Sequence, residues 1–166
     1  PATTAAPATT EPVDDGSCLE GDWIVNEEQM NAFYEGVMAT VDAPLDIHAV
    51  GSAVLWFDAD GTYGWLPDFS LNVEVAGRGG VGEATGNIVG NWEASGGVVT
   101  TSSDVNALVV TITIDSTTIN GSDMANGMLN SSPVNGVTYN CDGPTPVLDF
   151  KTSDPNVTVP IALAPA

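Results

Sequence analysis

The stretch from Ala49 to Val75 constrains the fold of this chain more than any other segment. Its first arm is apolar up to Asp58, and the dipeptide Asp60-Gly61 then interrupts the run. The second arm restarts with aromatic residues and ends in an alternation of apolar and polar residues. Asp-Gly between two arms rich in Val, Trp and Tyr is the strongest short-range signal for a β-hairpin. We therefore expect two long antiparallel strands joined by a tight turn at Asp60-Gly61.

Further strands are expected on both sides of this hairpin. Turn residues recur about every eight to twelve residues, which is the spacing of an antiparallel barrel or sandwich. The clearest segment runs from Val105 to Asp115, and the glycine-rich residues 76–80 are expected to form a turn. The other expected strands are 18–25, 84–93, 98–102, 137–141, 147–151 and 157–163. The sequence predicts an all-β antiparallel domain over residues 18–166 with about nine strands, arranged as a barrel or as a two-sheet sandwich.

One short helix is expected after the first strand. Asn26 is a favourable N-cap residue, and Gln29 occupies the capping-box position three residues later. Val25 and Met30 have the spacing of a hydrophobic staple. One apolar face follows at helical spacing, formed by Met30, Phe33, Tyr34, Val37 and Met38. The pattern predicts a helix over residues 26–38 that packs on the sheet.

The two cysteines, Cys18 and Cys141, lie near opposite ends of the expected domain. A single pair in this arrangement indicates one disulfide and an oxidising compartment. Such a bond would close a loop of about 120 residues. The alternative is two buried thiols that do not pair.

The charge of the chain excludes several classes of partner. It carries 22 acidic residues against only Arg78 and Lys151, a formal net charge of −20. Nucleic acids and anionic lipid surfaces require clustered basic residues, so neither is expected as a partner. No stretch has the length and apolarity of a transmembrane segment.

No pattern of residues points to catalysis, to a metal or to a cofactor. His48 is the single histidine and has no cysteine nearby that would complete a zinc site. If Gly61 is aligned with the glycine of an EF-hand loop, Trp56 and Pro67 occupy positions that require acidic ligands. The segment Asp58–Gly61 is therefore interpreted as a turn. We expect a protein that is not an enzyme and has no catalytic residues, metal or cofactor.

Residues 1–17 are rich in Pro, Thr and Ala and show no apolar period. This composition is typical of an extended linker or arm. The arm is expected to tether the domain or to dock on a neighbouring subunit.

Four pieces of sequence follow one another in a characteristic order. A Cys-x-x-Gly-x-Trp segment, Cys18 to Trp23, precedes the expected helix, and Phe57 to Tyr63 reads Phe-Asp-x-Asp-Gly-Thr-Tyr. Thr138 to Cys141 completes the series as Thr-Tyr-x-Cys. The combination resembles a set of secreted actinobacterial proteins, often lipoproteins, and Gly-x-Trp at Gly21–Trp23 resembles the motif of lipocalin-like barrels. The resemblance implies a lipocalin-like barrel, located outside the cell or on the cell envelope. In contrast to lipocalins, the helix follows the first strand and no C-terminal helix is expected.

The resemblance favours a non-enzymatic extracellular domain that holds a small apolar ligand in the barrel. Such pockets are mostly apolar. The residues expected to line the pocket are Trp56, Tyr63, Trp65 and Trp92. Leu55 and Phe57 alternate with Trp56, so they are expected on the opposite face, under the helix or a partner chain.

The alternative is a structural subunit of an extracellular filament or surface assembly. In that case copies of the chain would associate, and the arm of residues 1–17 would dock on the next subunit.

Overall fold

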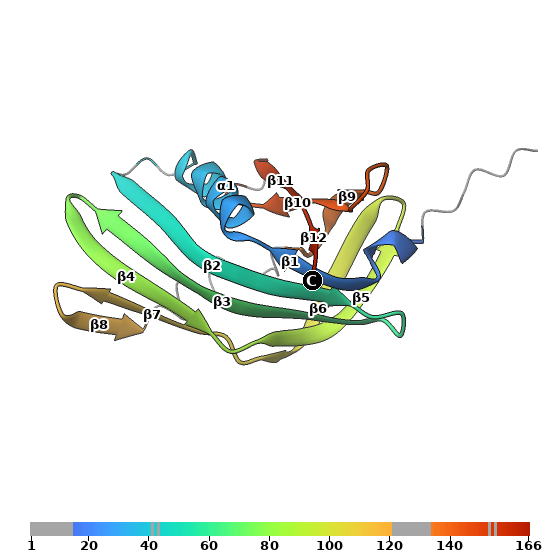
Figure 1. Cartoon of the computed structure of the whole chain (residues 1–166), viewed down its shortest axis with the longest axis horizontal. Helices are drawn as coiled ribbons and strands as arrows, with labels where there is room; N and C mark the ends of the chain where they lie inside the picture. Colours follow the sequence, from blue (N-terminus) through green and yellow to red (C-terminus); the bar gives the residue numbers. More distant parts are fainter. Residues whose placement is uncertain (1–14, 41, 43, 121–133, 153, 155) are drawn as a thin grey trace, which may run out of the picture.

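The computed structural model describes residues 15–40, 42, 44–120, 134–152, 154 and 156–166. Within these ranges the chain forms one α-helix, α1 (Glu27–Met38), a short 3-10 helix, η1 (Ser17–Leu19), and twelve strands (Figure 1). The strands are β1 (Gly21–Val25), β2 (Leu45–Phe57), β3 (Thr62–Val75), β4 (Arg78–Thr85), β5 (Ile88–Ser95), β6 (Val98–Asn106), β7 (Val109–Ile114), β8 (Thr117–Asn120), β9 (Val137–Asn140), β10 (Val147–Lys151), β11 (Thr158–Ala162) and β12 (Ala164–Pro165). All strand pairs are antiparallel, which confirms the all-β expectation.

The hairpin of β2 and β3 forms the centre of the sheet. The two strands pair along their whole length, from Leu45 opposite Val75 to Phe57 opposite Tyr63. The turn between them is closed by the backbone N–H of Asp58, which donates to the carbonyl of Thr62 at 2.8 Å. The long hairpin predicted from the sequence is thereby confirmed.

The far side of β3 divides the sheet into two parts. Thr62–Trp65 pairs with β5, whereas Phe69–Val75 pairs with β4. We call the part with β1, β5, β6 and β9–β12, together with the adjoining ends of β2 and β3, the closed end. The part with β4, β7 and β8, together with the other ends of β2 and β3, is the open end. Figure 1 shows β4, β7 and β8 at the opposite end of the molecule from β9 and the β5–β6 hairpin, with α1 above β2.

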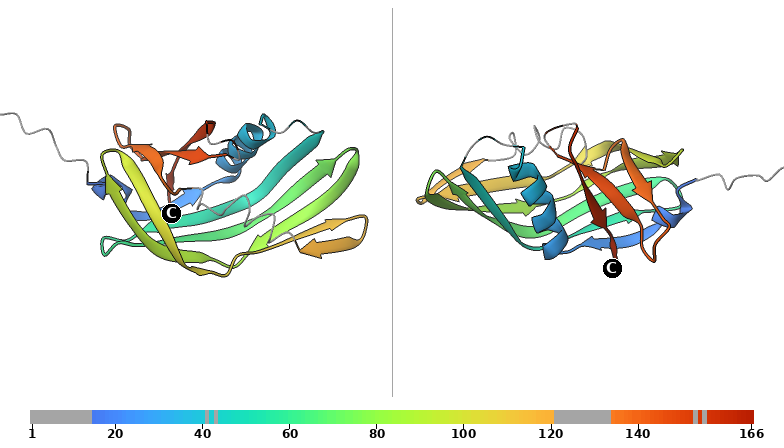
Figure 2. Two further views of the ribbon diagram at one scale, coloured as in Figure 1. Left: turned by 180° about the vertical axis from the view of Figure 1, so that it is seen from behind. Right: turned by 90° about the horizontal axis from the view of Figure 1, so that it is seen from above.

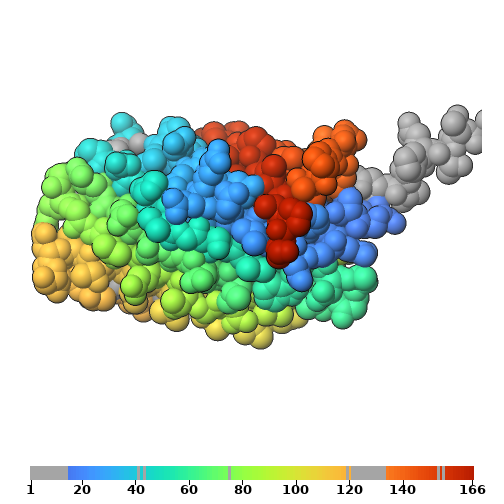
Figure 3. Space-filling model, in the orientation of Figure 1, coloured from blue at the N-terminus to red at the C-terminus, as the bar shows by residue number. Residues whose placement is uncertain are grey.

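At the closed end the sheet curls so far that the strands at its two ends, β11 and β12, follow one another directly along the chain. β11 pairs with β10 and β12 pairs with β1, yet only Leu163 separates β11 from β12. The backbone N–H of Leu163 donates to the carbonyl of Pro146, and that of Ala166 donates to the carbonyl of Asp22. Figure 3 shows the C-terminal residues in red against the blue residues of the N-terminal strand. The fold is one curled, barrel-like sheet, which settles the choice between barrel and sandwich.

The predicted glycine turn at residues 76–80 is partly wrong, because Arg78–Thr85 forms β4. Gly80 lies opposite Ile114 of β7, and a Cβ there would come within 2.7 Å of the Ile114 side chain. The glycines of this segment therefore make room for bulky residues on neighbouring strands. Such a requirement comes from tertiary packing and not from local turn chemistry.

The helix follows its sequence signals. The Asn26 side chain accepts from the backbone N–H of Gln29 at 3.0 Å, and the Gln29 side chain accepts from that of Asn26 at 2.8 Å. α1 lies along the first half of β2 and beside β11, over the hollow side of the sheet (Figure 2). The capping box predicted for this helix is confirmed.

The core fills the closed end. Leu55 and Phe57 of β2, Tyr63 of β3 and Leu148 of β10 are all at most 1% exposed. Cys18 and Cys141 form a disulfide with a Cα–Cα distance of 6.2 Å, as the sequence indicated, and both half-buried cysteines pack against this core.

Only the last residues of the expected arm fall within the described ranges. Gly16 is buried, and a Cβ there would meet the Ala94 side chain at 2.3 Å. The last residues of the expected arm thus pack against β5. The predicted docking of the arm on a neighbour concerns residues 1–17, of which residues 1–14 lie outside the described residues.

Candidate functional site

Three of the four aromatic residues expected to line a pocket face the interior of the closed end. Tyr63 is 0% exposed and Trp65 is 8% exposed, both on the inward face of β3. Trp92 reaches inward from β5, is half-buried, and donates from its indole N–H to the Asp58 carbonyl at 2.9 Å. Their placement agrees with the expected interior position, and their role in ligand binding stays a prediction.

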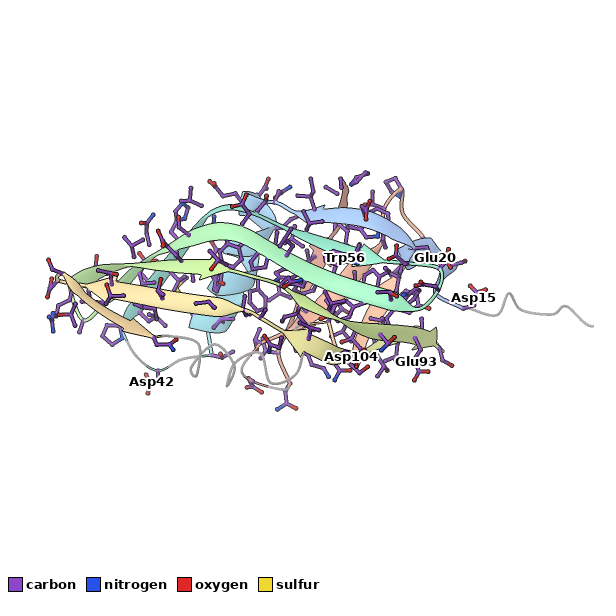
Figure 4. The ribbon with its side chains drawn as sticks, turned by 90° about the horizontal axis from the view of Figure 1, so that it is seen from below. Asp15, Glu20, Asp42, Trp56, Glu93 and Asp104 are labelled. Carbon is purple, nitrogen blue, oxygen red and sulfur yellow. A yellow bond between two sulfur atoms is a disulfide. The ribbon has the colours of Figure 1, made fainter. Side chains whose placement is uncertain are left out.

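The interior position expected for Trp56 is wrong. Trp56 lies on the outer face of β2, where it pairs with Gly64 of β3 (Figure 4). A Cβ on Gly64 would come within 1.8 Å of the Trp56 ring, so the ring lies across this glycine. Alternation along a strand sends one face inward, and that face carries Leu55 and Phe57. The expectation for the two faces of β2 at this point was therefore inverted.

Ring contacts pack the aromatic residues of the closed end against one another. The Phe57 ring lies 6.1 Å from that of Tyr63 and 5.1 Å from that of Trp92. Trp65 contacts Phe150 edge to face, with the ring centroids 6.4 Å apart. In the structure, the side chains of Tyr63, Trp65 and Trp92 therefore pack with the aromatic residues of the core. Trp92 also lines a shallow pocket of about 230 Å³ over the β5–β6 hairpin.

At the open end, the bulky side chains on the same inward face are only half-buried, whereas small residues such as Ala84 are buried. Ile47 of β2, Val73 of β3 and Ile114 of β7 lie in one row across the sheet, with Gly80 of β4 between the last two. The next two rows repeat this plan, with bulky residues on β3 and β7 and a small residue on β4: Leu71, Gly82 and Ile112, then Phe69, Ala84 and Val110. We call these three rows the concave apolar face.

Sequence reasoning missed the concave apolar face because β4 was interpreted as a turn. The available signal was the alternation of β7, in which Val110, Ile112 and Ile114 share one side. A large contiguous apolar patch that is not fully buried marks an interaction or ligand-binding site.

The outer face of the open end carries a polar groove of about 530 Å³. His48, Asn72 and Thr113 line it together with the carboxylates of Asp46 and Glu74. His48 is exposed there. Among the described residues, no three His, Cys, Asp or Glu side chains gather as metal ligands would.

In the acidic turn at Asp58–Gly61, the Asp60 carboxylate accepts a hydrogen bond from the backbone next to the turn. The Asp60 side chain accepts from the backbone N–H of Thr62 at 2.9 Å. Hydrogen bonds from the Thr62 hydroxyl and backbone N–H hold the pKa of Asp60 below its ordinary value. This geometry agrees with the interpretation of the segment as a turn.

Among the described residues, one buried side-chain polar group in the interior, the Thr101 hydroxyl, has no hydrogen-bond partner. The Thr101 hydroxyl on β6 is buried and makes no hydrogen bond, although the Thr101 backbone N–H donates to the Asn135 side chain at 3.1 Å. A buried hydroxyl without a partner costs about 1–3 kcal/mol. The hydroxyl itself therefore lowers the stability of the domain.

We expect Thr101→Val to raise the free energy of unfolding by about 1–2 kcal/mol, because the isosteric methyl needs no hydrogen bond. Urea denaturation followed by tryptophan fluorescence measures the change. Thr100→Val, at the adjacent exposed position, is the matched control and should change stability by less than about 0.5 kcal/mol. A destabilised T101V variant would contradict this prediction.

A comparison of the chain with protein-family models gives no match, and neither does a comparison with curated proteins. The helices in the described part of the chain are not long and apolar enough to cross a bilayer. The candidate site that emerges from the geometry is the concave apolar face of the open end.

Proposed function

We propose that the protein is a non-enzymatic extracellular domain that binds a small apolar ligand on the concave apolar face of its open end. One observation carries the proposal, namely the uneven burial of a single face of the sheet. The inward residues Leu55 and Tyr63 are 0% exposed at the closed end. Their counterparts at the open end, such as Ile47 and Val73, are only half-buried.

The chemistry of this face suits an apolar ligand. Its described side chains in the three rows carry no polar group, and α1 lies along β2 at one side of it. Each CH₂ group removed from water contributes about 0.8 kcal/mol to binding. A chain-like apolar ligand along the three rows would supply several such groups.

The ligand is expected to be uncharged or cationic at its polar end. The chain has a formal net charge of −20, which repels anions approaching from solution. The disulfide supports the extracellular part of the proposal, because such bonds persist in oxidising compartments.

Binding of the neutral fluorescent probe N-phenyl-1-naphthylamine tests the proposal. We expect the wild-type protein to enhance its fluorescence, and Ile112→Glu to weaken binding about tenfold or more, because a charge then lies in the apolar face. Thr111→Glu, the neighbouring residue of β7 on the outer side, is the matched control and should bind like the wild type. Circular dichroism confirms that both variants fold. Equal binding by both variants, or none by the wild type, would reject the site.

The alternative role, a subunit of an extracellular filament or surface assembly, depends on the arm. Its proposed docking segment is residues 1–17, of which residues 1–14 lie outside the described residues. Deletion of residues 1–17 followed by electron microscopy tests this role, and unchanged assembly would count against the arm.

A further inference from the structure

The outer face of the closed end carries a continuous apolar surface. We call it the outer patch, and it consists of Ile24, Val54, Trp56, Leu66, Val89 and Val105. Strand register places these residues side by side. Ile24 of β1 pairs with Val54 of β2, which pairs with Leu66 of β3. In the adjoining row Trp56 lies across Gly64, and Gly64 pairs with Val89, which in turn pairs with Val105 of β6.

The outer patch is exposed where a solvated strand face is usually polar. Leu66 is 44% exposed and Val105 is 51% exposed, and the other members are half-buried. The same outer face at the open end is mostly polar, with Ser70, Asn72 and Thr113 in equivalent positions. An apolar cluster across five strands is unusual for a surface that only meets water.

Exposed carboxylates surround the outer patch. Asp22 lies directly opposite Trp56 on β1, Asp68 follows Leu66 by two residues on the same face, and Asp104 precedes Val105. Figure 4, seen from below, shows Trp56 and Asp104 on this outer side of the sheet.

The basic groups of the described chain do not neutralise this rim. Arg78 lies at the far end of β4, where it forms an ion pair with Asp115. The Lys151 ammonium donates to the Asn135 carbonyl at 2.9 Å. The outer patch therefore has an apolar centre and an acidic border.

We propose that the outer patch is a docking surface for a basic amphipathic polypeptide segment of a partner protein. The apolar side of such a segment covers Leu66 and Val105, and its Lys and Arg residues face Asp22, Asp68 and Asp104. A second copy of this chain fits less well, because two surfaces from chains with net charge −20 would bring acidic borders together. Charge complementarity thus selects the basic partner.

A synthetic helical peptide with a leucine stripe flanked by lysines serves as the probe, and its affinity for the full chain is measured by fluorescence anisotropy. We expect the double substitution L66S/V105S to weaken binding about tenfold or more. Val81→Ser is the matched control, because Val81 is a 46% exposed outer-face residue at the open end, outside the outer patch. That control should bind within about twofold of the wild type.

Charge is tested separately with D22N/D68N/D104N, which should weaken binding and reduce its dependence on salt. Equal losses in L66S/V105S and V81S would overturn the proposal, since they would indicate unspecific attraction to an acidic protein. Tight binding of the same peptide with glutamates in place of lysines would also overturn it. So would analytical ultracentrifugation that finds a dimer of the wild type that L66S/V105S abolishes, because the occupant would then be a second copy.

Discussion

Replacement of both Cys18 and Cys141 by alanine is expected to lower the free energy of unfolding by about 5 kcal/mol. The disulfide joins residues 123 positions apart, so it closes a loop that contains most of the domain. In the chain-entropy description a loop of this length restricts the unfolded chain strongly. Domains of this size have total stabilities of about 5–15 kcal/mol, so the loss is a large part of the whole.

The bond also fastens the beginning of the domain to the sheet. Cys18 lies in η1, beside the buried Leu19, and Cys141 directly follows β9. Urea unfolding of the oxidised wild type and of C18A/C141A measures the difference. Wild type treated with a reductant is the control and should unfold like the double variant. A difference below about 1 kcal/mol between oxidised and variant protein would contradict the entropic argument.

Local signals in the sequence were sufficient for the central hairpin and for the helix. Asp60-Gly61 specifies a tight turn, and the arms on both sides contain enough β-favouring residues to extend it. Asn26 and Gln29 bond each other's backbone within four residues of sequence, so the start of α1 needs no distant partner. The disulfide was predictable because two cysteines allow only one intramolecular pair.

Features that depend on distant segments could not be predicted in the same way. The glycines of β4 predict a turn when only neighbouring residues are considered. Their actual role is to make room for Ile114 and Leu71, which lie on other strands. β2 is apolar on both faces around Trp56, so alternation alone cannot say which face is inside. The ring of Trp56 finds its place on Gly64, a residue on another strand. The candidate site could not be predicted for the same reason, because its rows combine residues of four strands, β2, β3, β4 and β7.

The edge of β2 next to α1 is covered by side chains of the helix and not by a neighbouring strand. β1 pairs with the Ala53–Phe57 part of β2, and no strand of the described residues pairs with the rest of that edge. Side chains of α1 take the place of that strand. The Asn31 side chain donates to the carbonyl of Ala49 at 3.0 Å and accepts from its N–H at 2.7 Å.

Two further helix residues extend this pattern along β2. The Glu27 carboxylate accepts from the Gly51 N–H at 3.3 Å, and the Met38 sulfur accepts from the Ile47 N–H at 3.1 Å. The residues of β2 that bond α1 are every second residue, Ile47, Ala49 and Gly51. This spacing is expected because the backbone groups of every second residue point to the same edge of a strand. A strand edge with unpaired groups favours pairing with another chain, so α1 protects the protein against aggregation.

We expect Asn31→Leu to lower the free energy of unfolding by about 2–3 kcal/mol, because it leaves both polar backbone groups of Ala49 without partners. Amide hydrogen exchange of Ala49 should become faster, and aggregation on mild heating should increase. Asn31→Asp keeps the acceptor for the Ala49 N–H and should give an intermediate loss. Ala32→Leu, on the exposed side of α1, controls for the new leucine.

A stability of N31L within about 0.5 kcal/mol of that of A32L would mean that water satisfies the edge as well as Asn31 does. The exchange of Ala49 separates this case from a general loss of helix packing, because packing losses would also speed exchange in α1 itself. If only the β2 edge loses protection, the amide of Asn31 acts as the missing peptide group of a neighbouring strand. The helix that follows β1 then covers the part of the β2 edge that β1 does not pair with.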